Sequence, residues 1–134
     1  MALYLADTTV LIDYLRGHSE VRARLDELVD EDAHDLAVCA VSVGEVFAGL
    51  REQDREATAR FLSSFVYLDL SFDIARAAGE YRYSLARKGQ ALKLTDLLIG
   101  AAALAIDAVL LTDNVRDFPL AGLRVERLPA SRRR

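Results

Sequence analysis

The feature that most constrains the fold is an apolar stretch over residues 93–114, which reads KLTDLLIGAAALAIDAVLLTDN. Its first part combines Leu and Ile with alanines, which are strong helix formers, and leaves almost no polar face. This pattern predicts a buried helix, in which the small Gly100 allows close packing against a sheet. The last part, Ala108 to Thr112, has the composition of a short buried strand. Asp96 begins the stretch and Asp113 ends the strand, so two carboxylates bracket one buried helix and strand.

Shorter apolar runs elsewhere alternate with segments of helical spacing. The predicted strands are Leu3–Ala6, Leu36–Val41, Val66–Leu70, Ala108–Thr112 and an edge strand at Leu123–Leu128. The other predicted helices are Thr8–Leu15, Ser19–Asp30, Ser42–Arg51, Glu56–Phe65 and Asp73–Lys88. Such alternation predicts an α/β fold, a three-layer α/β/α sandwich with a mainly parallel central sheet.

Length and composition limit the class of protein. A chain of 134 residues with 52% apolar residues fits one domain over residues 1–134, with a frayed basic tail at 130–134. It contains neither a signal-peptide pattern nor an apolar run of membrane-spanning length, so we expect a cytoplasmic protein without membrane contact. Its single cysteine, Cys39, lies in an apolar strand pattern and is expected to be structural.

Acidic side chains follow several of the predicted strands. Each of four separate segments supplies one of the acids Asp7, Glu45, Asp96 and Asp113, with Asn114 and Asp117 close behind. In a parallel sheet with right-handed crossovers, ligands bind outside the carboxyl ends of the strands, so these side chains are expected to converge. Clustered carboxylates raise one another's pKa unless a cation neutralises them. Oxygen ligands without Cys or His indicate Mg²⁺ or Mn²⁺.

Each acid also has a simpler structural interpretation. Asp7 and Asp96 each stand where a helix N-cap is expected. Ser42 and Glu45 match the S-x-x-E capping box, in which the glutamate folds back onto the serine backbone. Asp113 is an ordinary turn former. The functional interpretation therefore depends on the joint placement of the acids and on no single residue.

The motifs around these acids resemble the PIN-domain ribonucleases, specifically the VapC-type toxins of bacterial toxin-antitoxin pairs. The resemblance is carried by LADTTVLID, SVGEVFAGL, KLTDLLIGAAA and the ending LLTDNVRDF, and it covers essentially the whole chain. It implies that Asp7, Glu45, Asp96 and an acid of the loop 112–117 hold Mg²⁺ for hydrolysis of an RNA phosphodiester bond. Such an ion can generate hydroxide from a bound water.

The fourth acid departs from the family pattern. Many relatives place it two residues after the threonine, where this chain has Asn114. We expect Asp113 to serve, with Asp117 as the second choice. Thr112 and Ser42 are expected to support the carboxylates or a phosphate by hydrogen bonds.

Basic residues and partners complete the expectations. The net charge is −4, which excludes a chain that binds nucleic acid through overall positive charge. Basic residues that flank the proposed site are candidates for RNA binding, although a solvated helix charge is the favoured interpretation of any single one: Arg16, Arg82, Arg87, Lys88, Lys93 and Arg116. The resemblance implies a homodimer and a small antitoxin that covers the acidic site. An exposed apolar surface on the helices of residues 42–65 would fit such partners, and core packing explains the same residues: Val46, Phe47, Leu50, Phe61 and Leu62.

Two other functions compete with the nuclease. One is phosphoryl transfer through an aspartyl intermediate on Asp7, although the sequence Asp7-Thr8-Thr9 lacks the second acid expected two positions later in haloacid-dehalogenase-type phosphatases. The other is a non-catalytic protein-binding module in which the acids only cap helices.

Overall fold

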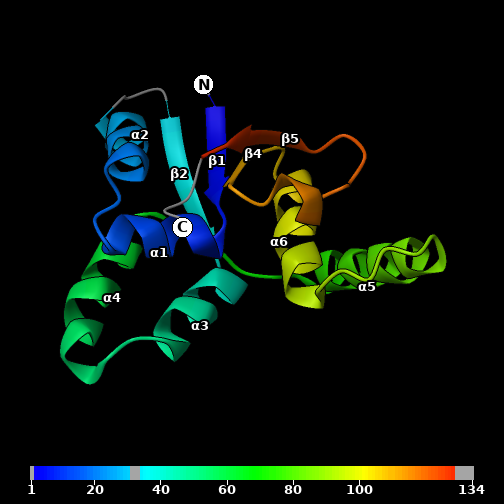
Figure 1. Ribbon diagram of the computed structural model, residues 1–134, viewed down its shortest axis with the longest axis horizontal. Coiled ribbons are helices and arrows are strands. Elements are labelled where there is room, and N and C mark those ends of the chain that lie inside the picture. Colours follow the sequence, from blue (N-terminus) through cyan, green and yellow to red (C-terminus); the bar gives the residue numbers. More distant parts are fainter. Residues whose placement is uncertain (1, 31–33, 129–134) are drawn as a thin grey trace.

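Five parallel strands form the centre of the molecule (Figure 1). The computed structural model describes residues 2–30 and 34–128, so the predicted frayed tail lies outside the described residues. The strands are β1 (Ala2–Ala6), β2 (His34–Cys39), β3 (Val66–Leu68), β4 (Val109–Thr112) and β5 (Arg124–Arg127). Their order is β3-β2-β1-β4-β5, and each neighbouring pair is parallel. This confirms the predicted parallel sheet, with β1 at its centre.

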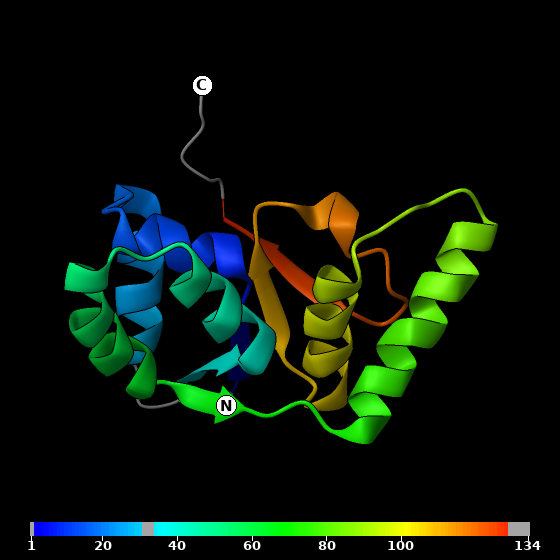
Figure 2. The same cartoon turned by 90° about the horizontal axis from the view of Figure 1, so that it is seen from below.

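Helices cover both faces of this sheet (Figure 2). On one side lie α1 (Thr8–Leu15), α2 (Ser19–Asp30), α3 (Ala40–Ala48) and α4 (Arg55–Ser63). On the other side lie α5 (Phe72–Arg87) and α6 (Leu94–Ala105). Two short 3-10 turns are η1 (Glu52–Asp54) and η2 (Val115–Asp117). The predicted α/β/α sandwich is therefore confirmed.

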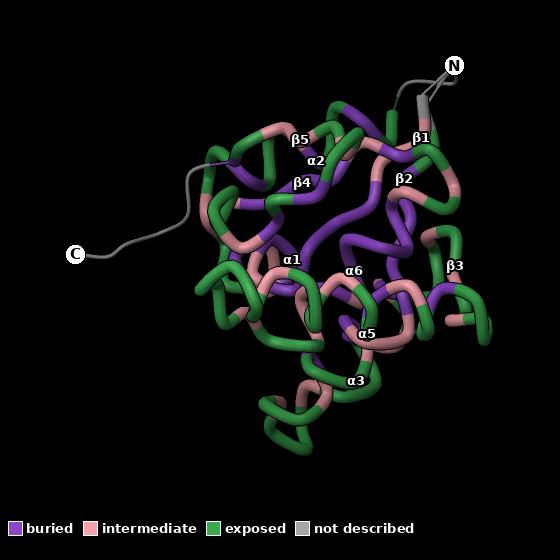
Figure 3. Tube along the Cα trace, turned by 90° about the vertical axis from the view of Figure 1, so that its right-hand side faces the viewer, coloured by how far each residue is buried: buried purple, intermediate pink, exposed green. Residues whose placement is uncertain are grey.

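The central strand is buried on both faces, which explains its unbroken apolar sequence. Leu5 packs in the cluster beneath α5 and α6, whereas its neighbour Ala6 packs in the cluster beneath α1 and α2; neither is exposed to solvent. Figure 3 shows the buried chain running through the middle of the molecule. No helix in the described residues is both long and apolar enough to cross a bilayer.

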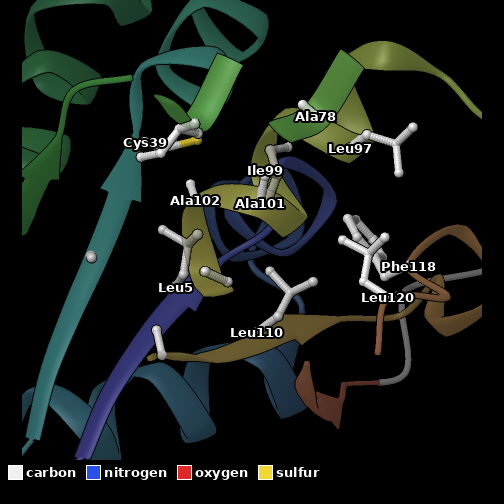
Figure 4. Close-up of a cluster of buried hydrophobic side chains, with 14 residues drawn as sticks. Leu5, Cys39, Ala78, Leu97, Ile99, Ala101, Ala102, Leu110, Phe118 and Leu120 are labelled. Atoms are coloured by element: carbon white, nitrogen blue, oxygen red, sulfur yellow. The ribbon is translucent and has the colours of Figure 1, made fainter. Parts of the chain in front are cut away.

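Gly100 of α6 permits close packing, but its nearest neighbours belong to a loop. A Cβ atom at this position would lie 2.8 Å from Cδ1 of Leu120 and 3.3 Å from Cδ1 of Phe118. Figure 4 shows both side chains beside α6, in the loop that follows β4. The absence of a side chain at Gly100 thus lets this loop lie against α6.

Two helices begin at least two residues earlier than the sequence predicted. α3 begins at Ala40 with Cys39 as its N-cap, so Ser42 lies inside the helix and the predicted capping box with Glu45 is wrong. α6 begins at Leu94 with Lys93 as its N-cap, so Asp96 is not a cap either. In both cases the polar residue read as a cap lies within the first turns of the helix, where its side chain is available for other contacts.

The expected exposed apolar surface on residues 42–65 is also not found. Val46 and Leu62 are buried, and Phe61 stacks on Tyr14 with the ring centroids 4.8 Å apart. These side chains pack in the core beneath α1 and α2. The exposed large apolar residues among those described lie elsewhere: Val29, Val66, Tyr67, Phe72, Tyr83, Leu94 and Val115.

Candidate active site

A cavity of about 260 Å³ lies where the carboxyl ends of β1 and β4 meet α3 and α6. The residues that line it come from the loops and helix starts along this edge: Asp7, Thr8, Thr9, Ile12, Glu45, Lys93, Thr95, Asp96, Asn114 and Asp117. Four of them are acids that lie far apart in the sequence. The structure therefore brings them together at the edge of the sheet that the topology predicts.

Asp7 is held at this edge by three donors. Its carboxylate accepts hydrogen bonds from the backbone N–H of Thr8 at 2.7 Å, the hydroxyl of Thr112 at 2.7 Å and the hydroxyl of Thr9 at 3.3 Å. Burial raises the pKa of Asp7, the three hydrogen bonds oppose that increase, and the charge of Glu45 adds to it. Asp7 is also the N-cap of α1, so both interpretations of this residue hold at once. The contact from Thr112 was expected from the sequence.

Asp96 lies in the first turn of α6 and is half-buried. Burial raises its pKa to about 6, and the negative charges of Asp7, Asp117 and Glu45 contribute, while Lys93 lowers the pKa. The positive end of the helix dipole favours an anion by only about 0.3–1 kcal/mol, which does not offset these effects. The four carboxylates are thus close enough to repel one another.

Glu45 is positioned by Thr8. The Thr8 hydroxyl lies 2.6 Å from Oε1 of Glu45 and 3.0 Å from Oγ of Ser42, which is fully buried. Ser42 thereby supports the site through Thr8; among the described residues its hydroxyl forms no hydrogen bond with a carboxylate of the cavity. Thr8 was not predicted as a site residue, although its position immediately after Asp7 at the end of a strand could have indicated it.

The two candidates for the fourth acid of the site, Asp113 and Asp117, lie at different places in the loop after β4. Asp117 lines the cavity, and its negative charge contributes to the raised pKa of Asp96. Asp113 lies outside the cavity, with its Oδ1 3.3 Å from Nη2 of Arg127. Asp113 immediately follows β4 and pairs with Arg127 at the end of β5, whereas the η2 turn places Asp117 on the cavity wall.

The donor atoms of the cavity suit a hard divalent cation. Within residues 2–30 and 34–128, no three Asp, Glu, His or Cys side chains form a group that would hold a metal ion directly. Mg²⁺ and Mn²⁺ nevertheless accept carboxylate oxygens and keep several waters, which span carboxylates that are not in contact. A cation here would also relieve the repulsion that raises the pKa of Asp96.

The basic candidates occupy different places. Lys93 lines the acidic cavity, Arg116 lines an adjoining cavity and Arg16 lines a groove between α1 and α4. The remaining candidates lie on or just after α5 and line none of these three hollows: Arg82, Arg87 and Lys88.

Comparisons with known proteins agree with this geometry. The PIN domain family matches residues 4–121. The chain is 37% identical over 118 residues to Ribonuclease VapC19 of Mycobacterium tuberculosis, covering 87% of this chain and 92% of that protein. The structure of VapBC2 from Rickettsia felis bound to a DNA fragment from its promoter superposes with a TM-score of 0.79 at 24% identity, covering 93% of this chain and 98% of that one. A toxin-antitoxin complex from Klebsiella pneumoniae superposes with a TM-score of 0.70 at 29% identity, covering 91% and 93%.

Proposed function

The chain belongs to the PIN-domain family, and on that premise we propose that it is a metal-dependent endoribonuclease, the toxin of a toxin-antitoxin pair. The observation that carries the proposal is the convergence of Asp7, Glu45, Asp96 and Asp117 on one cavity, where their mutual repulsion contributes to the raised pKa of Asp96. The activity in the name of a relative with 37% identity, a ribonuclease, supports the same conclusion.

The four cavity acids are the residues that would hold Mg²⁺ or Mn²⁺. When bound, such an ion lowers the pKa of a coordinated water and stabilises charge on the phosphate oxygens. Lys93 adds a positive charge beside Asp96, where it can bind an oxygen of the RNA phosphate. No side-chain nucleophile is needed for hydrolysis by this route.

The hydrogen bonds of the site assign different roles to its carboxylates. Both oxygens of Asp7 accept hydrogen bonds, Oδ1 from Thr8 and Oδ2 from Thr112 and Thr9. This suits a fixed ligand, and it disfavours Asp7 as the nucleophile of a phosphotransferase. Glu45 accepts a hydrogen bond from Thr8 at Oε1, so Oε2 is the oxygen that would accept a proton from the attacking water.

A groove beside the cavity is suited to the protein partner. It has a volume of about 590 Å³, lies between α1, α3 and α4, and shares Ile12 and Glu45 with the acidic cavity. An antitoxin segment in this groove would cover the entrance to the acids. The 29% identical structure from Klebsiella pneumoniae is a toxin-antitoxin complex, which supports a partner of this kind.

A homodimer is part of the same proposal. The helix α5 exposes Phe72 and Tyr83, and the start of α6 exposes Leu94; burial of such large apolar side chains favours association. Light scattering of the purified protein, alone and with the antitoxin, measures both assemblies. A monomer at all concentrations would contradict the dimer and leave the nuclease proposal intact.

Cleavage of single-stranded RNA in the presence of Mg²⁺ tests the activity. We expect cleavage by the unmodified protein, its loss in EDTA, and a decrease on the order of 10²–10³-fold in Asp96→Asn, because a preorganised charge is removed. Asp73→Asn, which changes an exposed acid on α5, is the matched control. Full activity of Asp96→Asn or in EDTA would overturn the proposal, and a melting temperature unaffected by millimolar metal would favour the binding module.

A further inference from the structure

A second cavity, of about 440 Å³, adjoins the acidic one. It is lined by the residues of the loop after β4 and by the end of β5: Asp113, Asn114, Val115, Arg116, Asp117 and Arg127. Because Asn114 and Asp117 line both hollows, the two cavities lie next to each other along the same edge of the molecule. The acidic cavity has four acids and one basic residue, Lys93, whereas the second cavity has two acids and two arginines.

Arg127 is fixed beside this second cavity by its strand and by an ion pair. It is the last residue of β5 and lies opposite Thr112 in the register of β4 and β5. Its Nη2 is 3.3 Å from Oδ1 of Asp113, and its side chain is 61% exposed. A guanidinium group carries five N–H donors in a planar fork, so it can contact this carboxylate and a phosphate together.

Arg116 lies in the loop after β4, and hydrogen bonds connect the backbone of this loop to the active site. The N–H of Asn114 donates to the Thr112 hydroxyl at 3.0 Å, and that hydroxyl donates to Asp7. Phe118, at the other end of the turn, is buried against α6. Arg116 itself is exposed, and no acid among the described residues forms an ion pair with it. Its charge is therefore available for an anion.

We propose that this second cavity is a phosphate subsite, in which Arg116 and Arg127 hold an RNA phosphate that neighbours the one at the acidic cavity. The inference rests on the proposed nuclease function and deepens it. A protein with a net charge of −4 and four acids at the site repels a polyanion, so arginines beside the acids offset that repulsion where the strand continues.

Salt dependence of RNA binding tests the subsite directly. The probe is a labelled single-stranded RNA pool of random sequence, bound to Asp96→Asn protein so that cleavage does not interfere. The logarithm of the affinity falls as the logarithm of the salt concentration rises. Each lost phosphate contact reduces the magnitude of this slope by about 0.7, so Arg116→Ala with Arg127→Ala is expected to reduce it by about 1.4. Replacement of both residues by lysine keeps the charges and should keep most of the slope.

Kinetics in the otherwise unmodified protein give a second readout. The double alanine variant should raise KM several-fold and leave kcat within about two-fold, because the subsite binds substrate and transition state alike. Arg60→Ala with Arg76→Ala is the matched control, since these arginines lie on α4 and α5 and line neither cavity. Arg116→Ala alone breaks no ion pair, so it keeps the test informative if loss of the Arg127 contact disturbs folding.

The outcomes separate the subsite from the nuclease. If the unmodified protein cleaves RNA but the slope and KM of the variants do not change, the subsite is overturned and the proposed function stands. If the unmodified protein neither cleaves nor binds RNA, both proposals are overturned.

Discussion

The two sides of the acidic cavity hold their carboxylates by different means. At the junction of β1 and α1, three hydrogen-bond donors fix Asp7. On the α6 side, no hydrogen bond among the described residues holds the Asp96 carboxylate, and Asp117 is carried by a loop that packs on Gly100 through apolar side chains. The first side is thus organised by directional bonds and the second by packing, with its charges in mutual repulsion. A cation has the most repulsion to relieve on the second side.

The largest effect on stability is expected when a directional bond of the first side is removed. Thr112→Val keeps the shape of the side chain but removes the hydroxyl that donates to Asp7 and accepts from the N–H of Asn114. We expect about 1–3 kcal/mol of lost stability, from buried polar groups left without partners, and about 10–100-fold lower RNA cleavage. Chemical denaturation and initial rates measure the two effects.

Thr9→Val is the control for that substitution. Its hydroxyl is 3.3 Å from the same carboxylate, a longer and weaker contact, so the loss should be clearly smaller. Equal effects of the two variants would show that the junction does not depend on Thr112.

The sequence predicted the first side better than the second. A short apolar strand followed by Asp7 is a local pattern, and the strand, the helix after it and the contact from Thr112 are all present. The start of α3 was misplaced because Cys39, a residue without a capping side-chain bond, ends the strand and caps the helix. The end of β2 is set by its pairing with β1 and β3. That pairing cannot be read from the local sequence.

On the second side, the position of the acids depends on contacts between distant segments. The choice between Asp113 and Asp117 depends on how the η2 turn lies on α6, which Gly100 and the side chains of the loop decide. Arg127 was not considered as a site residue, because nothing in the local sequence RVER shows that β5 ends beside the loop. The pairing of β4 with β5 is what places Arg127 beside the loop.

A pair of glycine substitutions separates packing on the second side from helix propensity. Gly79→Ala in α5 meets nothing within 4 Å, so it should raise stability by about 0.5–1 kcal/mol, the usual gain of alanine over glycine in a helix. Gly100→Ala has the same gain, but its Cβ would lie 2.8 Å from the buried Leu120 side chain. Overpacking of this kind costs about 1–3 kcal/mol, so we expect a net loss of about 1 kcal/mol.

Activity distinguishes the same two variants. A shift of the loop that carries Asp117 should lower RNA cleavage by Gly100→Ala protein and leave Gly79→Ala protein unchanged. If Gly100→Ala were as stable and as active as Gly79→Ala, packing of the loop on α6 would not position the acid.

The smallest expected effect on stability concerns the charge of Asp96. Its pKa rises from 3.8 to about 6 on folding, so the folded state binds more protons than the unfolded state between these values, and stability falls as the pH rises through this range. Asp96→Asn removes this dependence. At about pH 7.5 and without metal, we expect the variant to be more stable by on the order of 1 kcal/mol, after allowance for a half-exposed group.

Melting temperatures measured at several pH values, with and without Mg²⁺, test whether the charge of Asp96 causes this difference in stability. Melting temperatures of the unmodified protein and Asp96→Asn should converge near pH 4, where the carboxyl is largely protonated in the folded state. Mg²⁺ at about neutral pH should stabilise the unmodified protein more than the variant, because the ion interacts with the charged form of Asp96. The most stable metal-free protein would then be the inactive one, as expected if the second side of the cavity gives up stability in order to hold a cation. An Asp96→Asn protein that is less stable at every pH would instead show that the carboxylate stabilises the fold.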